Sequence, residues 1–215
     1  MIIFGEAGVG KSSLVNLILG ADKAKVNANA GGCTFETTRY SVQIEGKNYN
    51  LYDTAGLGEA NGGTVGRRKA IVNLYKLVSK LADTGGVNLL ICVVKCGRLS
   101  HGVEKNYDMF HQAICEAKVP IVIVVTNCEN AVDLDDPDQT MDSWWNQNEE
   151  RFERAALRFE NYACVCASRG RKLKDGTYSN DEPFEDSRGK VDALIHQCCL
   201  PNGWSKVSHV HRSGR

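Results

Sequence analysis

Eight residues near the start of the chain have the types and spacing of a phosphate-binding loop. The run GEAGVGKS at residues 5–12 follows the pattern GxxxxGKS and lies between an apolar run and a run with helical periodicity. Its glycines let successive backbone amides curl around a phosphate, and the N-terminus of the following helix adds positive potential. A lysine here reaches the outer phosphates of a nucleotide, and a hydroxyl after it binds Mg²⁺. We expect the loop contacts to be Glu6, Ala7, Gly8, Val9, Gly10, Lys11, Ser12 and Ser13.

A second box, DTAG at residues 53–56, ends an alternating apolar run. A carboxylate at a strand end can hold a Mg²⁺-bound water, and the Gly56 amide can meet a γ-phosphate because no side chain stands in the way. Between the boxes, Thr34 is a candidate second Mg²⁺ ligand, presented when the γ-phosphate is bound. We expect the metal ligands to be Ser12, Thr34 and Asp53, and the catalytic residues to be Lys11, Thr34 and Gly56.

The elements that must position these boxes follow from the alternation of short apolar runs with longer periodic ones, which is typical of helices packed on a mainly parallel sheet. Strands are expected at residues 2–5, 39–45, 48–53, 87–95, 120–125 and 162–167, with a hairpin around Gly46-Lys47. Helices are expected at residues 11–19, 64–82, 103–117, 140–159 and 187–199, and a polar loop at 169–186. One domain would span residues 1–200, followed by a tail at 201–215.

The second predicted helix has one apolar face, formed by Ile71, Leu74, Tyr75, Val78 and Leu81.

The order of GxxxxGKS, Gly-Cys-Thr, hairpin and DTAGL resembles the septin-related GTPases of the TRAFAC class. These include immunity-associated GTPases and chloroplast import-receptor GTPases, and the resemblance is closest to stand-alone fungal G-domain proteins. The run GRLS at residues 97–100 is similar to a Gly-Arg-x-Thr turn of the immunity-associated group. The resemblance, over residues 2–200, implies an α/β, three-layer P-loop NTPase G domain. Its six-stranded, mostly parallel sheet would have one antiparallel edge strand, and its activity would be GTP hydrolysis to GDP with Mg²⁺.

The box for base recognition departs from the family pattern Asn-Lys-x-Asp. Residues 126–129 read Thr-Asn-Cys-Glu after the strand PIVIVV, so Thr126 takes the asparagine position and Glu129 the aspartate position. A carboxylate there accepts two N–H bonds from guanine, whereas adenine offers one comparable donor. In an alternative register, Asn127 and Asn130 take these roles and the carboxylate is lost. The base-binding set is thus Thr126, Asn127 and Glu129, with Ala167 and Ser168 resembling the loop whose amide touches guanine O6.

Leu57 stands where small signalling GTPases carry the glutamine that orients the attacking water. Leucine cannot do this, so hydrolysis is expected to depend on another side chain, a partner or a dimer. Glu59 and Arg39 are the candidates within the chain, and Arg98 and His101 lie where septin-like relatives pair their G domains face to face. The alternative to an enzyme is a slow nucleotide-gated switch or scaffold that dimerises through this face. An ATPase of the same architecture is a third possibility, which Glu129 argues against.

Composition and charge exclude other classes of function. The chain has 215 residues, with 26 Lys and Arg against 26 Asp and Glu, so it carries no extended basic footprint for nucleic acid or a membrane surface. No hydrophobic stretch is long enough to span a membrane, and the cytoplasm is the expected compartment. The nine cysteines include no CxxC pair, which predicts reduced, buried thiols. The expected partners are a guanine nucleotide and a second copy of the chain across the G face, with no nucleic acid and no membrane span.

Overall fold

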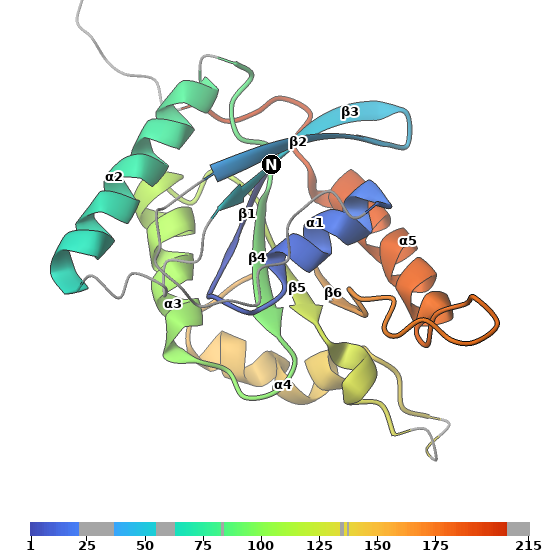
Figure 1. Ribbon diagram of the computed structural model, residues 1–215. Helices are drawn as coiled ribbons and strands as arrows, with labels where there is room; N and C mark the ends of the chain where they lie inside the picture. The colour runs from blue at the N-terminus through green and yellow to red at the C-terminus, as the bar shows by residue number, and fades with distance from the viewer. Residues whose placement is uncertain (22–36, 55–62, 83, 134–135, 137, 206–215) are drawn as a thin grey trace, which may run out of the picture.

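A single six-stranded sheet forms the centre of the computed structural model, which describes residues 1–21, 37–54, 63–82, 84–133, 136 and 138–205. The strands lie in the order β2-β3-β1-β4-β5-β6 (Figure 1). All neighbouring strands are parallel except β2 and β3, which form an antiparallel hairpin at the edge. The predicted fold class is therefore confirmed. The strands are β1 (Ile2–Gly5), β2 (Thr37–Ile44), β3 (Lys47–Thr54), β4 (Leu90–Lys95), β5 (Ile121–Thr126) and β6 (Tyr162–Val165).

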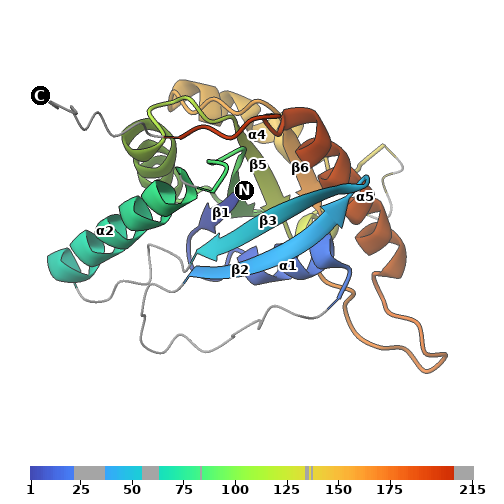
Figure 2. The same cartoon turned by 90° about the horizontal axis from the view of Figure 1, so that it is seen from above.

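Two layers of helices cover the sheet (Figures 1 and 2). Helices α1 (Lys11–Leu19) and α5 (Asp181–Cys198) pack on one face, and α2 (Gly63–Ala82), α3 (His101–Tyr107) and α4 (Ser143–Arg154) on the other. Successive strand residues point to opposite faces, so Ile2 and Phe4 join the core under α2, α3 and α4, while Ile3 joins the core under α1 and α5. Strands β4 and β5 are almost wholly buried, which explains their unbroken apolar runs.

Several boundaries differ from the predicted ones. Helix α5 begins at Asp181 rather than at residue 187, because acidic residues and a proline suit the first turn of a helix although the stretch looks like a polar loop. Helix α3 is short and continues as a π-helix, η2 (Asp108–Ile114). Helix α4 and strand β4 are shorter than predicted, and a 3₁₀ turn, η3 (Cys128–Asn130), follows β5.

The apolar side chains that share one face of α2 do not all reach the core. Leu74, Val78 and Leu81 are buried against the sheet, whereas Ile71 and Tyr75 are 39% and 50% exposed. The apolar face of α2 is wider than the surface by which the helix contacts the sheet. Periodicity alone therefore cannot separate the buried apolar residues from the exposed ones.

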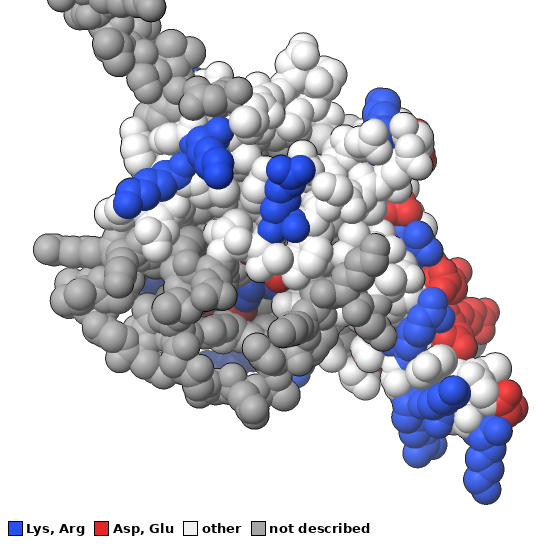
Figure 3. Space-filling view, turned by 45° about the horizontal axis from the view of Figure 1, so that its top comes forward, with Lys and Arg blue, Asp and Glu red and all other residues white. Residues whose placement is uncertain are grey.

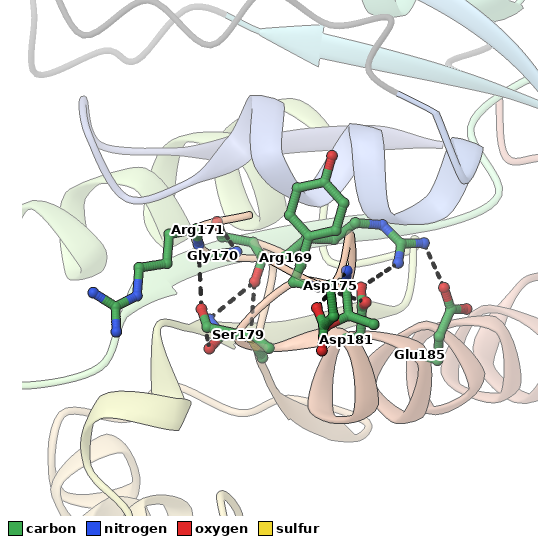
Figure 4. A network of polar contacts seen from close by, with 12 residues as sticks. Arg169, Gly170, Arg171, Asp175, Ser179, Asp181 and Glu185 are labelled. Carbon is green, nitrogen blue, oxygen red and sulfur yellow. Dashed lines mark hydrogen bonds and ion pairs between the residues drawn. The ribbon is translucent and has the colours of Figure 1, made fainter. Parts of the chain in front are cut away.

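The chain between β6 and α5 forms a projecting arm at residues 169–180. Within it, Leu173 N–H donates to Thr177 O at 2.8 Å, and Lys172 and Tyr178 form an isolated antiparallel bridge. At the base of the arm, Arg169 donates to Asp181 at 2.7 Å and to Glu185 at 2.5 Å, both on α5 (Figure 4). The guanidinium also lies 4.4 Å from the ring centroid of Phe184. This part of the predicted polar loop is therefore folded back on α5.

The first residues of the predicted tail pack onto the domain. Val87 and Trp204 exchange both backbone hydrogen bonds, at 2.8 and 2.9 Å, and Leu200 is bonded to Asn88. Residues 206–215 lie outside the described residues, and the domain boundary at residue 200 stays a prediction. Among the described residues, no helix is long and apolar enough to cross a membrane.

Candidate nucleotide site

The loop at residues 5–12 connects β1 to α1 at the carboxyl edge of the parallel strands, where open α/β sheets bind their ligands. Gly10 adopts the left-handed conformation with φ 93° at the start of α1. A Cβ at Gly5 would lie 2.3 Å from the Val93 carbonyl oxygen, so the loop leaves the sheet through a space that admits only glycine. Ala7 and Gly8 are exposed at the tip of the loop, and Val9 is buried beneath it.

Lys11 is held over this loop by the loop's own backbone. Its side chain is only 8% exposed, and Nζ donates to the carbonyl oxygens of Glu6 at 2.7 Å and Gly5 at 3.2 Å. The ammonium group is thereby fixed beside the backbone amides that would surround a phosphate. This arrangement can bind a polyphosphate through fixed positive charge and amide donors.

Ser12 and Asp53 meet across 41 residues of sequence. The Ser12 hydroxyl donates to Asp53 Oδ2 at 3.3 Å, while the other carboxylate oxygen, Oδ1, is buried and has no hydrogen-bond partner among the described residues. Burial raises the pKa of Asp53, and the nearby Lys11 and Ser12 partly oppose this rise. Hydroxyl and carboxylate oxygens are ligands that Mg²⁺ prefers, so these two side chains fit that metal. Ser13, the next residue, is half-buried on α1.

Thr126, the last residue of β5, bonds the backbone of the phosphate-binding loop. The side chain is fully buried, and its hydroxyl lies 2.6 Å from the Val9 carbonyl oxygen and 3.3 Å from that of Val94. A Cβ at Gly10 would come within 3.1 Å of the same hydroxyl. Thr126 therefore joins β5 to the loop, and its predicted contact with the nucleotide stays a prediction.

The residues after β5 and β6 form the other end of the site. Asn127 has φ 62°, and Glu129 is half-buried, with Oε2 buried and without a hydrogen-bond partner in the described chain. Its Oε1 accepts from Asn130 Nδ2 at 3.3 Å. Beyond the end of β6, Ala167 is 8% exposed and Ser168 is exposed. The choice between Glu129 and the alternative register stays a prediction.

Cys166 is a neighbour of this site that sequence reasoning treated only as a buried thiol. Burial and the adjacent Glu129 carboxylate raise the pKa of Cys166 to about 11, against a lowering effect of the Ser168 backbone. The thiol donates to the Ser168 carbonyl oxygen at 3.1 Å, and the Cys166 N–H donates to Ser187. The thiol of Cys166 is therefore neutral and lies beside Glu129. In the sequence, the only indication of this position is that Cys166 follows the last strand directly.

The remaining predicted residues divide into two groups. Thr34, Gly56, Leu57 and Glu59 lie outside the described residues, so their predicted roles stay predictions. Arg39 is exposed on β2, one residue from Thr38, which pairs with Asp53. Arg98 is exposed in the segment between β4 and α3, and His101 is exposed as the first residue of α3.

Comparison with known proteins relates the chain to GTPases. The family model described as 50S ribosome-binding GTPase matches residues 1–152. The tRNA modification GTPase MnmE of Thiobacillus denitrificans is 35% identical over 147 residues, which cover 67% of this chain and 29% of that protein. The GTPase Der of Staphylococcus haemolyticus is 29% identical over 192 residues, covering 89% of this chain and 41% of Der. The chain thus spans less than half the length of these curated relatives.

Solved structures show the same fold at low sequence identity. Toc33 from Arabidopsis thaliana, in a dimerization-deficient mutant, superposes with a TM-score of 0.55 at 18% identity, covering 90% of this chain and 81% of Toc33. Era from Aquifex aeolicus, bound to GDP and AlF4⁻, superposes with a TM-score of 0.59 at 16% identity, covering 96% of this chain and 58% of Era. At these identities the likeness concerns the fold alone.

Proposed function

This chain belongs to the 50S ribosome-binding GTPase family, within the TRAFAC class of P-loop GTPases, and from that premise we propose that it binds GTP with Mg²⁺ and hydrolyses it to GDP and phosphate. The observation that carries the proposal is the Ser12–Asp53 pair beside the buried Lys11 at the mouth of the phosphate-binding loop. Positive charge, backbone amides and oxygen ligands for a divalent cation lie together there, which is the combination that a nucleoside triphosphate requires.

Each loop residue has a role in binding the phosphates. The amides of residues 6–13 surround the β-phosphate, and Lys11 bonds the β- and γ-phosphates while keeping its backbone acceptors. Ser12, Thr34 and Asp53 would hold Mg²⁺, and Asp53 Oδ1 has no other hydrogen-bond partner among the described residues. The metal would supply positive charge to the phosphate oxygens. Gly56 offers its amide to the γ-phosphate.

Glu129 determines the choice of guanine over adenine. Its buried oxygen without a partner supports this role, because a purine that donates two N–H bonds would satisfy both carboxylate oxygens. Asn127, Ala167 and Ser168 complete the base site, and Thr126 contributes by holding the loop. A purine with a single donor would make one hydrogen bond fewer to the carboxylate, and it would therefore bind less tightly than guanine.

Hydrolysis by this chain depends on a group other than residue 57. A second copy across the G face is the candidate, and the subtype is that of the septin-related GTPases, on the strength of DTAGL and the run GRLS at 97–100. Dimerization is important for the GTPase activity of the chloroplast translocon components atToc33 and psToc159, whose solved structure shares this fold. That property belongs to those proteins, and it supports dimerisation here as part of the proposal.

The proposal is tested by incubating the purified chain with GTP or ATP and Mg²⁺ and separating the products by chromatography. GTP-selective release of phosphate is expected, and Lys11→Ala should reduce nucleotide binding or turnover below detection because the fixed charge at the phosphates is lost. Lys80→Ala, an exposed lysine on α2, is the matched control. Undiminished hydrolysis by Lys11→Ala would refute the phosphate-loop assignment.

Base specificity is tested separately. Glu129→Ala should weaken GTP binding about tenfold or more while ATP binding changes little, because the carboxylate pairs with donors that only guanine presents. Titration calorimetry with both nucleotides measures the difference, and Glu153→Ala, an exposed acid on α4, is the control. Equal losses for GTP and ATP would favour the alternative register with Asn127 and Asn130.

A nucleotide-gated switch is the second candidate function, favoured by Leu57 in the place of the water-orienting glutamine. In this case the γ-phosphate changes the segments around Thr34 and Gly56, which then bind a partner, and hydrolysis acts as a timer. The rate separates the two functions. Turnover within about 10⁻⁴ to 10⁻² s⁻¹ indicates a switch, and faster turnover indicates an enzyme whose output is hydrolysis.

A further inference from the structure

The Glu6 side chain leaves the phosphate-binding loop and lies on the first turn of α3. Its Oε2 accepts a hydrogen bond from the hydroxyl of Ser100, 94 residues away. Ser100 is the N-cap of α3, and its oxygen also accepts from the Gly102 N–H at 3.2 Å. The hydroxyl thus uses its donor on the loop and its acceptor on the helix.

Gly102 provides the space that this contact needs. A Cβ at this position would lie 1.9 Å from Glu6 Oε1 and 2.3 Å from the carboxyl carbon. Gly102 lies within α3, so the residue is needed for space and not for an unusual backbone conformation. The Glu6 carboxylate occupies the volume that any other side chain would take.

The backbone of the same glutamate holds the lysine of the site. Lys11 Nζ donates to the Glu6 carbonyl oxygen at 2.7 Å, the shorter of its two bonds to the loop. We propose that Glu6, Ser100 and Gly102 form a latch that fixes the loop backbone on α3 and thereby positions Lys11 for the nucleotide phosphates. The inference rests on the proposed nucleotide binding and adds positioning residues to it.

The latch also keeps the negative charge of the Glu6 carboxylate away from the nucleotide phosphates. A free carboxylate within a phosphate-binding loop would repel the anionic ligand, and it would also compete for Lys11. Bonding to the Ser100 hydroxyl keeps the Glu6 carboxylate on α3. Loss of the latch should therefore weaken phosphate binding more than the loss of one hydrogen bond elsewhere on the surface.

Gly102→Ala is the first test, because it displaces the carboxylate without harming the helix. Alanine favours a helix more than glycine does, so the thermal midpoint without nucleotide should stay equal or rise. Affinity for GDP and for a non-hydrolysable GTP analogue should fall about five- to tenfold, while the ratio of GTP to ATP affinity stays constant because the base end is untouched. Gly189→Ala, on α5 with open space around it, is the matched control and should bind as the wild type does.

Ser100 variants separate the latch from the helix cap. Ser100→Asp retains an N-cap but sets one carboxylate against another, so nucleotide affinity should fall by a similar factor with little change in thermal midpoint. Ser100→Thr keeps the hydroxyl and should bind normally. Adding Glu6→Gln to Ser100→Asp removes the repulsion and should recover part of the affinity.

The results distinguish the latch from the proposed function. A wild-type chain that binds neither GDP nor the GTP analogue refutes the proposed function itself. A wild-type chain that binds them, with unchanged affinity in both Gly102→Ala and Ser100→Asp, refutes the latch alone. A loss of affinity with an equal loss of thermal stability in both variants also refutes it, because a general weakening of the fold would then suffice.

Discussion

At the scale of single residues, the site contains buried carboxylate oxygens that lack a hydrogen-bond partner and therefore destabilise the ligand-free protein. Asp53 is half-buried, one of its oxygens has no partner among the described residues, and burial raises its pKa. Glu129 likewise has one buried oxygen without a described partner. Buried polar atoms without hydrogen bonds cost stability, and they gain most from a ligand that supplies the missing partner. The two unpartnered oxygens therefore indicate where a ligand would bind.

Asp53→Asn should stabilise the protein in the absence of metal and nucleotide. A pKa raised by burial means that the native state binds the Asp53 proton more tightly than the unfolded chain, so this group favours folding at acid pH. Its contribution is lost as pH rises through the folded-state pKa. At pH 7 the variant should melt about 2 °C higher than the wild type, and the gap should close in acid.

Differential scanning calorimetry across this pH range measures the effect. Asp108→Asn, an exposed aspartate, is the control and should not change the midpoint. The same Asp53 variant should lose Mg²⁺-dependent nucleotide binding. A lower midpoint for Asp53→Asn at pH 7 would show that its contacts with Lys11 and Ser12 outweigh burial.

At the scale of elements, the loops at the carboxyl edge of the sheet are held by contacts from other elements. Thr126 of β5 bonds the loop after β1, and Ser100 before α3 bonds the same loop. Lys190 of α5 also pairs with Asp142 at the start of α4 at 2.7 Å, which joins these two helices. A binding site built on loops needs such supports, because loops alone do not fix side chains within bonding distance.

The side chain of Arg169 makes the ion pairs between the arm at residues 169–180 and α5. Arg169→Ala removes two ion pairs with α5 and the contact with Phe184, and it should lower the thermal midpoint by about 2 °C, a modest effect because the pairs are partly exposed. Trypsin should then cut faster within the arm. Arg171→Ala is the control, since Arg171 has no ion pair in the described chain. Equal cutting rates would show that the backbone bonds suffice to hold the arm.

At the scale of the whole molecule, charge and thiols follow the layered architecture. On the face shown in Figure 3, Lys and Arg side chains gather together with Asp and Glu near the arm and α5. Of the eight described cysteines, all are free, and Cys92, Cys115, Cys128, Cys164 and Cys166 are buried. The sheet and its covering helices therefore isolate most of the thiols, as the composition predicted.

Alkylation of the native protein should follow this burial. Cys96, Cys198 and Cys199 are half-buried and should react with iodoacetamide at pH 8 before the five buried thiols. Burial raises the pKa of Cys92 to about 12, so its reactive thiolate is scarce as well as inaccessible. Peptide mass spectrometry measures the order of labelling, with a fully labelled sample in denaturant for comparison. Early labelling of Cys92 or Cys164 would contradict the packing of the sheet.

Local sequence patterns were enough to predict the class of fold, and they also carry the prediction of the site. GxxxxGKS, DTAG and the alternation of apolar runs are local patterns, and the elements around them form where the patterns end. The antiparallel hairpin at the sheet edge was also predictable, because Gly46 marks the turn between two alternating strands.

Contacts between residues far apart in the chain could not be predicted in this way and come from the packing of the elements. This packing buried Thr126 beneath the phosphate loop, set Glu6 against Ser100, and placed Cys166 beside Glu129. It left Ile71 and Tyr75 exposed on a helix whose periodicity does not distinguish them from Leu74. Such contacts depend on distances between elements, and these distances come from the packing of the two helical layers on the sheet, which no local pattern of residue types encodes.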